Sequence, residues 1–242
     1  MRMGRLFSST STPVVELREY LLTPSKAMDY VKATADTSEL RKSLVPLRLF
    51  AIPDTGGMLN KAVHFYDYQS LQEREDKRGV QAQNADWQSY LKLSRPCCET
   101  QQSSIWAEAP FVRDSTDWGM KVASLDGSAS ANTIYELRRY KLELGYDTVP
   151  KFLCHYEKGL ASKLEAAEET QSSSFCSLMY SEVGMTNEVI EIWRHDGAEG
   201  MERTREASRN KVAWREAIGN IAPLGREFTT TLVRPTAFSN WR

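Results

Sequence analysis

The sequence predicts an α+β protein made of two tandem ferredoxin-like (βαββαβ) modules that close into one barrel. The main observation is an internal repeat. Residues 14–20 (VVELREY) nearly match residues 134–140 (IYELRRY), at an offset of 134 − 14 = 120. A second set of matches lies at an offset of 214 − 87 = 127 and pairs Gly57 with Gly184, Trp87 with Trp214 and Pro96 with Pro223. Matches that keep one order and one spacing indicate a duplicated module.

Each module begins with a strand, because residues 14–22 and 133–142 alternate in polarity and are rich in β-branched and aromatic side chains. Thr23 and Pro24 then favour a helix start, with proline at the first helical position. A β-hairpin follows, and a capping box opens the second helix at residues 70–73. The remaining predicted strands are 46–53, 58–67 and 103–108 in the first module, and 174–183, 187–195 and 227–234 in the second.

The second helix of each module is expected to break. In the second module, residues 201–212 and 214–221 place their apolar side chains on nearly opposite helical faces. A straight helix cannot bury both stripes against one sheet. Gly79 lies where the break can occur in the first module, and Trp87 and Trp214 are predicted to anchor the returning segments to the sheets.

The polar residues of the first strands are the candidate site. A sheet covered by helices on one face leaves the other bare, and two such sheets can cover each other as a barrel. Alternation separates Leu17 and Leu137, which we expect under the helices, from six polar residues that we expect inside the barrel: Glu16, Arg18, Tyr20, Glu136, Arg138 and Tyr140. There they either satisfy one another in a filled interior or line a pocket for a polar small molecule.

Composition excludes several classes of protein. Of 242 residues, 41% are hydrophobic and 26% charged, which is typical of a globular chain. The net charge of −1 offers no basic excess for a phosphate backbone, so we expect no nucleic-acid partner. No apolar run reaches the roughly 18 residues of a transmembrane helix. The four cysteines form no Cys-x-x-Cys pair, which favours reduced thiols.

Residues 1–13 differ from the rest of the chain. They carry Arg2 and Arg5, five hydroxyl side chains at positions 8–12, and no acidic residue. This composition is typical of a mitochondrial transit segment, with a disordered tail as the alternative. The predicted modules cover residues 14–112 and 133–242. Residues 113–132 between them are rich in Gly, Ser and Asp and lack periodicity, which predicts a linker.

No catalytic motif is visible, so we name no catalytic residue and expect no cofactor. The sequence lacks a nucleophile elbow, a phosphate loop, a dinucleotide-binding glycine pattern and a zinc-protease helix. Its three histidines are scattered, which predicts no metal site. Haem ligation by His64 or His155 is the alternative to an ordinary hydrogen-bonded histidine.

These residues resemble the NIPSNAP family. The run at residues 16–20 (ELREY) and its copy at 136–140 (ELRRY) resemble the start of a NIPSNAP domain, and the C-terminal run at 234–239 is similar to that family's ending. The first module also holds further family-motif residues: Asn60, His64, Arg74, Arg78 and Trp87. The likeness covers nearly all of residues 14–242. The second module departs from the pattern, because Met201 stands where the first has Arg74, which favours a mainly structural second module.

The resemblance implies a tandem dimeric α/β-barrel fold and a mitochondrial location, in the matrix or associated with a membrane. It also implies protein partners, such as adaptors in vesicle transport or in the autophagy of damaged mitochondria, and it supplies no catalytic residue. We therefore expect a non-enzymatic mitochondrial protein that binds other proteins, with homo-oligomers as a further option. The alternative is a small-molecule enzyme or binder that uses the barrel interior, as related monooxygenases do.

Overall fold

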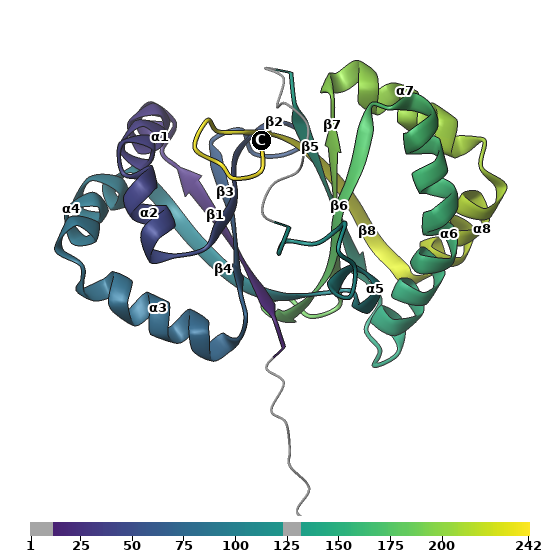
Figure 1. Cartoon of the computed structure of the whole chain (residues 1–242), viewed down its shortest axis with the longest axis horizontal. Coiled ribbons are helices and arrows are strands. Elements are labelled where there is room, and N and C mark those ends of the chain that lie inside the picture. The colour runs from purple at the N-terminus through teal and green to yellow at the C-terminus, as the bar shows by residue number, and fades with distance from the viewer. Residues whose placement is uncertain (1–11, 123–131) are drawn as a thin grey trace, which may run out of the picture.

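The computed structural model describes residues 12–122 and 132–242, which form the two predicted modules (Figure 1). Module 1 contains β1 (Val14–Leu22), α1 (Ala27–Asp36), α2 (Ser38–Leu44), β2 (Leu47–Thr55), β3 (Lys61–Tyr68), α3 (Leu71–Gln83), α4 (Ala85–Ser94) and β4 (Cys98–Glu108). The short α5 (Pro110–Arg113) follows. Module 2 contains β5 (Ile134–Leu142), α6 (Thr148–Thr170), β6 (Ser173–Val183), β7 (Glu188–His195), α7 (Gly197–Arg209), α8 (Val212–Ile221) and β8 (Gly225–Pro235).

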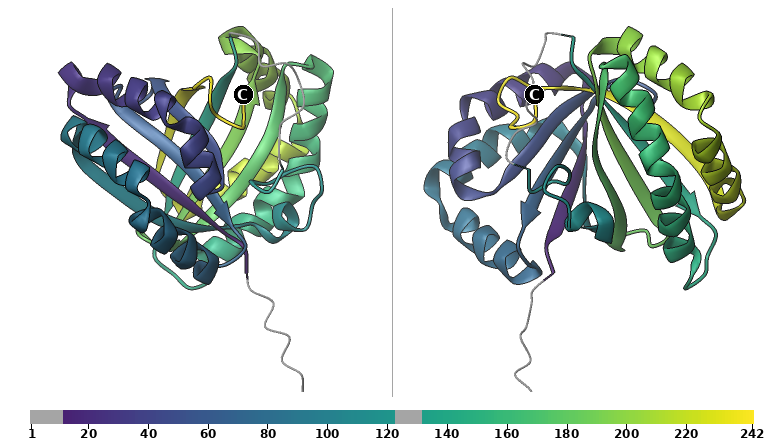
Figure 2. Two further views of the ribbon diagram at one scale, coloured as in Figure 1. Left: turned by 60° about the vertical axis from the view of Figure 1, so that its left-hand side comes forward. Right: turned by 45° about the vertical axis from the view of Figure 1, so that its right-hand side comes forward.

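The eight strands form one closed antiparallel barrel in the order β1-β3-β2-β8-β5-β7-β6-β4. Each module contributes four neighbouring strands, and two pairings join the modules: β2 with β8, and β4 with β6. The helices lie outside the strands in both views of Figure 2. The predicted intrachain dimeric α/β barrel is therefore confirmed, together with the βαββαβ order of each half.

The centre of the barrel interior is apolar, and this overturns the predicted orientation of the first strands. Leu17 packs in one buried cluster with Phe65 of module 1 and with Tyr135 and Ile190 of module 2, and Leu137 packs against the same cluster. The six candidate polar residues of β1 and β5 consequently point outward, under the helices: Glu16, Arg18, Tyr20, Glu136, Arg138 and Tyr140.

The physical reason for this correction is that both faces of each sheet are covered. Residues from two modules meet inside the barrel and exclude water there, which favours aliphatic side chains. On the other face the helices supply cations: Arg74 of α3 reaches Glu16, and Arg205 of α7 reaches Glu136. Glu16 and Glu136 therefore have charged partners under the helices.

The second helix of each module breaks as predicted, but Gly79 is not the breakpoint. Gly79 lies inside α3, and the chain turns at Asn84, whose side-chain oxygen accepts a 2.8 Å hydrogen bond from the Trp87 amide. Asparagine is a strong N-cap residue, so the break marks the start of α4. In module 2 the break separates α7 from α8 at residues 210–211.

Two connecting segments tie the modules together. The first part of the predicted linker packs on module 2, where the Gly119 amide donates to the carbonyl of Cys176 at 2.7 Å. After β8, Trp241 enters the barrel core, stacks on Tyr135 and donates its backbone amide to Arg48 of β2. Residues 1–11 of the predicted transit segment and residues 123–131 of the linker lie outside the described residues. Across the described ranges, no helix is long and apolar enough to span a membrane.

Candidate functional site

Each module holds a buried polar cluster between its sheet and its helices. The module-1 cluster comprises Glu16, Arg18, Tyr20, Arg41, His64, Tyr66, Arg74 and Arg78. The module-2 cluster comprises Glu136, Arg138, Tyr140, Lys163, Glu191, His195 and Arg205. The six candidate residues of β1 and β5 thus divide between two sites on opposite sides of the barrel.

Glu16 is the centre of the module-1 cluster and is fully buried. Its carboxylate accepts hydrogen bonds from Arg74 at 2.6 Å, from the Ser103 hydroxyl at 2.7 Å and from Arg18 at 3.2 Å. Burial acts to raise the pKa of Glu16, but Arg18, Arg74 and Ser103 outweigh burial and hold the pKa below its usual value. This shift favours the ionised form of Glu16, and the hollow beside it measures only about 200 Å³.

His64 lies fully buried beside this centre, between two tyrosines. Its Nε2 is 3.3 Å from the Tyr30 hydroxyl and its Nδ1 is 3.3 Å from the Tyr66 hydroxyl. Burial, with the nearby Arg41 and Arg18, lowers the pKa of His64 well below its usual value, so the imidazole stays neutral. Because both ring nitrogens have hydroxyl partners, this geometry argues against haem ligation by His64.

Arg41 of α2 is a further cation of the module-1 cluster, and sequence reasoning missed it. Arg41 is buried, donates to the hydroxyls of Tyr66 and Tyr90 at 2.6 Å each, and lies 4.9 Å from the centroid of the Trp87 ring. A single arginine on a short polar helix gives no sign that it points inward. Residues 31–49 contain no aromatic side chain, so nothing nearby in the sequence indicates the rings on which this desolvated guanidinium packs.

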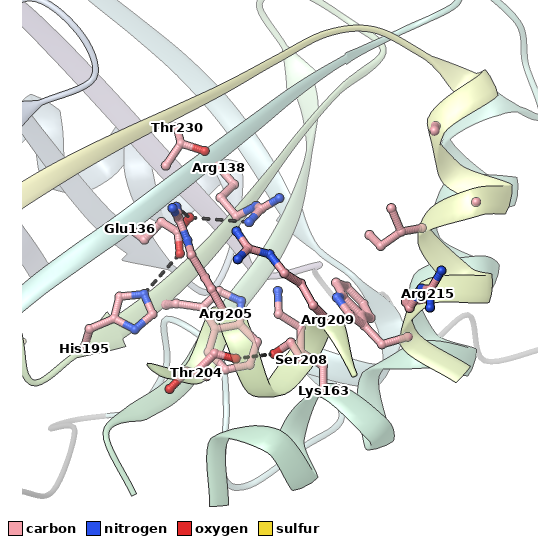
Figure 3. A pocket seen from close by; sticks show the side chains of 15 residues that line it. Glu136, Arg138, Lys163, His195, Thr204, Arg205, Ser208, Arg209, Arg215 and Thr230 are labelled. Carbon is pink, nitrogen blue, oxygen red and sulfur yellow. Dashed lines mark hydrogen bonds and ion pairs between the residues drawn. The ribbon is translucent and has the colours of Figure 1, made fainter. Parts of the chain in front are cut away.

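Glu136 is the equivalent centre in module 2 (Figure 3). Its carboxylate is 2.5 Å from the Arg205 guanidinium, 3.1 Å from Nε2 of His195 and 3.5 Å from Arg138. Burial opposes ionisation, but these three partners lower the pKa of Glu136 to about 2. The duplicated carboxylate is thus an anion in both modules.

Glu191 gives module 2 a second buried carboxylate, at the repeat position of His64 (64 + 127 = 191). It accepts hydrogen bonds from Lys163 of α6 and from the Tyr140 hydroxyl, and Arg138 lies 3.4 Å away. The ammonium of Lys163 sits 4.4 Å from the ring centroids of Trp193 and Trp214, as Arg41 sits on Trp87 in module 1. Sequence reasoning missed Lys163 and Glu191 as well.

The family-motif residues do not all gather at one place. Arg74 and Arg78 approach Glu16, and Trp87 packs under Arg41. Asn60 instead lies at the end of the β2–β3 hairpin and donates its side-chain amide to the carbonyl of Leu22. In residues 12–122 and 132–242, no group of three or more His, Cys, Asp or Glu side chains is placed to hold a metal ion. In the module-2 cluster, Nδ1 of His195 also lies 2.6 Å from the Ser173 hydroxyl, while its Nε2 lies 3.1 Å from the Glu136 carboxylate.

Comparison with known proteins agrees with this architecture. The NIPSNAP family model matches residues 15–113 and 135–240. Mouse protein NipSnap homolog 3B and human protein NipSnap homolog 3A are each 21% identical over 229 residues, which is 93% of this chain and 84% of theirs. A crystal structure of a Fusobacterium nucleatum protein, named only provisionally as a monooxygenase, superposes with a TM-score of 0.62 at 8% identity over 93% of both chains. That likeness shows the fold alone. Since the family model covers both modules, the chain belongs to the NIPSNAP family.

Proposed function

We propose that this chain is a non-enzymatic mitochondrial protein that acts by binding other proteins, and that the binding surface is an apolar groove on module 2. The groove has a volume of about 740 Å³ and runs between α5, the start of α6 and the β6–β7 hairpin. Its apolar lining consists of Pro110, Phe111, Val149, Pro150, Leu153 and Tyr180. Exposed apolar patches of this kind mark interaction sites on soluble proteins.

The surroundings of the groove extend this apolar surface. Leu144 is 76% exposed in the loop that leads to Val149, and Met185 is 64% exposed next to Thr186 of the groove. Three carboxylates line the groove and no lysine or arginine does: Asp114, Glu157 and Glu182. An amphipathic helix with apolar residues on one face and basic residues along its edges fits this combination of shape and charge.

Site-specific photo-crosslinking tests the proposal. A photoreactive amino acid at Leu153, in the groove, is expected to capture a defined protein in mitochondria, and Leu153→Asp is expected to abolish its co-purification. Leu93 of α4 is 66% exposed on module 1 and provides the matched control position. Capture of the same proteins from positions 153 and 93, or full binding by Leu153→Asp, contradicts a docking role for the groove.

A second candidate, small-molecule binding inside the barrel, is favoured by a cavity of about 440 Å³ at one end of the interior. Leu17, Phe65, Leu137 and Ile190 form its apolar wall. Glu19 lines the same cavity and accepts hydrogen bonds from Arg139 at 2.8 Å and from Lys61 at 3.1 Å. An apolar wall with a few fixed charges is typical of small-molecule sites.

Native mass spectrometry distinguishes this candidate from protein docking. A small molecule held in the barrel is expected to co-purify with the wild-type protein and to be lost from Ile190→Trp, which fills the cavity. Leu93→Trp adds the same side chain on the surface and should leave the ligand in place. If the wild type carries no small molecule, or if Ile190→Trp carries as much of it as the wild type does, the barrel cavity is not the binding site.

A further inference from the structure

Module 2 contains a pocket of about 650 Å³ that neither the protein-docking groove nor the barrel cavity uses. It lies outside the barrel, between the sheet of β5, β7 and β8 and the pair of helices α7 and α8 (Figure 3). Glu136 and His195 of the module-2 cluster form part of its wall. A concave site of this size is large enough for a small organic molecule.

The pocket is strongly basic. Five cations line it: Arg138, Lys163, Arg205, Arg209 and Arg215. Figure 3 shows the Arg209 side chain extending toward Arg138 and Glu136, with Arg215 apart from them on α8. Two carboxylates oppose them, Glu136 in the wall and Glu191 behind it, where Glu191 binds Lys163. With His195 counted as neutral, the sum is 5 − 2 = +3. A hollow lined by charge of one sign concentrates ligands of the opposite sign.

Two of these cations have no ionic partner in the protein. Arg138, Lys163 and Arg205 each form an ion pair with Glu136 or Glu191. Arg209, at the end of α7, and Arg215, in α8, form no ion pair with any residue in ranges 12–122 and 132–242. The structural carboxylates therefore account for three cations, and two guanidinium groups stay available to a ligand.

The duplication shows that these two arginines are not required by the fold. At the 127-residue offset, the module-1 counterparts of Arg209 and Arg215 are Ala82 and Gln88. Module 1 has α3 and α4 in the places of α7 and α8 and the same central carboxylate, yet its hollow is about 200 Å³. The added charge and the larger space therefore occur together in one copy only, as expected for a binding site and not for a packing requirement.

The remaining wall indicates the chemistry of the ligand. Trp193, Trp214, Ile218 and Ala222 give it apolar surface, and Thr204, Ser208 and Thr230 add hydroxyl groups. We propose that module 2 binds a small organic anion, with its carboxylate or phosphate group on Arg209, its apolar body against the tryptophan side of the pocket, and Arg215 adding positive charge at the α8 side. Arginine suits both groups, because its planar fork can donate two parallel hydrogen bonds to either.

Calorimetric titration of the full chain with four matched probes tests this proposal. The probes are 1-naphthoate, 1-naphthyl phosphate, 1-naphthalenemethanol and inorganic phosphate. At least one naphthyl anion is expected to bind about tenfold or more tightly than both the neutral alcohol and inorganic phosphate, since charge and apolar contact both contribute. The tighter of the two anions identifies the ligand as a carboxylate or a phosphate.

The variant Arg209→Ala/Arg215→Ala is expected to lose about tenfold or more of that affinity, without a change in melting temperature. Arg203→Ala/Arg226→Ala removes the same charge from two arginines whose ion pairs lie outside the pocket, with Glu199 and Glu143, and should bind as the wild type does. Equal binding of the neutral alcohol overturns the proposal. So does full affinity in Arg209→Ala/Arg215→Ala, or failure of both naphthyl anions to bind.

Discussion

Glu19 and Arg139 occupy the same position of the repeat (19 + 120 = 139), yet they carry opposite charges and pair with each other across the barrel at 2.8 Å. In a barrel of two identical chains, this position would meet its own copy, and like charges would oppose each other. Joining both modules in one chain allows the two copies to differ. The interface between the modules is therefore asymmetric, and the pair distinguishes one module from the other.

A double-mutant cycle on this pair tests its contribution to stability. Glu19→Gln and Arg139→Gln are expected to show a coupling free energy of about 1–2 kcal/mol in urea unfolding, because both side chains are largely buried. The pair of Lys141 with Glu227 is more exposed and serves as the control cycle, with an expected coupling below about 0.5 kcal/mol. Additive effects of Glu19→Gln and Arg139→Gln would show that the modules dock without help from this pair.

Arg18→Ala is expected to lower the free energy of unfolding by about 3–5 kcal/mol, because it removes a partner from the buried Glu16 carboxylate. Denaturant unfolding gives the measurement. Arg113→Ala breaks an exposed ion pair with Asp114 and should change stability by no more than about 0.5 kcal/mol. An Arg18→Ala protein as stable as the wild type would mean that Arg74 and Ser103 satisfy the Glu16 carboxylate without Arg18.

His64 is expected to make stability depend on pH. Its pKa is lowered in the folded protein, so it stays neutral there, whereas the unfolded chain binds a proton below about pH 6.5. The stability that His64 provides is thus complete above that pH and is lost as the pH falls. Relative to His64→Gln, the wild type should lose unfolding free energy between pH 7 and pH 5. Parallel pH profiles of the two proteins in urea would contradict a neutral His64.

Replacing Gly159 or Gly79 by alanine should change the stability of the protein in opposite directions. A Cβ at Gly159 of α6 would clash with Ala217 of α8 and come within 3.1 Å of the Trp214 ring, so Gly159→Ala is expected to cost about 1–3 kcal/mol. Gly79 of α3 has open space around it, so Gly79→Ala should raise stability by about 0.5–1 kcal/mol through helix propensity. Thermal unfolding of both variants is sufficient. A neutral Gly159→Ala would indicate that α6 and α8 separate easily.

The predicted targeting function of the N-terminal segment can be tested in a fusion protein. Residues 1–30 fused to a fluorescent reporter are expected to direct it into mitochondria, since transit segments are recognised by their basic, acid-poor character. The same fusion with Arg2→Ala and Arg5→Ala should remain in the cytosol. Cytosolic fluorescence of the unmodified fusion would remove the basis for a mitochondrial location.

The fold could be predicted because the duplication repeats every boundary signal. Strand β1 was predicted at its observed limits, and each hairpin and helix was supported twice. The orientation of β1 could not be obtained in the same way. Alternation shows that Glu16 and Leu17 lie on opposite faces, but both faces are buried here, so polarity does not reveal which one the helices cover. Arginines at positions 74 and 78, on the predicted helix, were the signal that the polar face lies beneath it.

The candidate site was only partly predictable, because its residues come from segments that lie far apart in the sequence. Glu16 and Glu136 stand out because the repeat conserves them within a short motif. Arg41 and Lys163 lie on helices of different length, where a single cation is normally solvated, and only the folded structure shows them packed on tryptophan rings. The pocket arginines belong to the half of the protein whose motif departs from the family pattern. The mainly structural second module stays a prediction, and anion binding in its larger pocket would contradict it.

The position of Trp241 constrains the order of events during synthesis. Its ring lies in the barrel core and its amide holds Arg48 of β2, so the interior stays incomplete until position 241 has left the ribosome. Until then, the emerging first half exposes Leu17 and Phe65 to water, as an edge-open sheet prone to association. Closure accordingly needs residues of both modules, and a nascent chain halted after module 1 should depend on chaperones to remain monomeric.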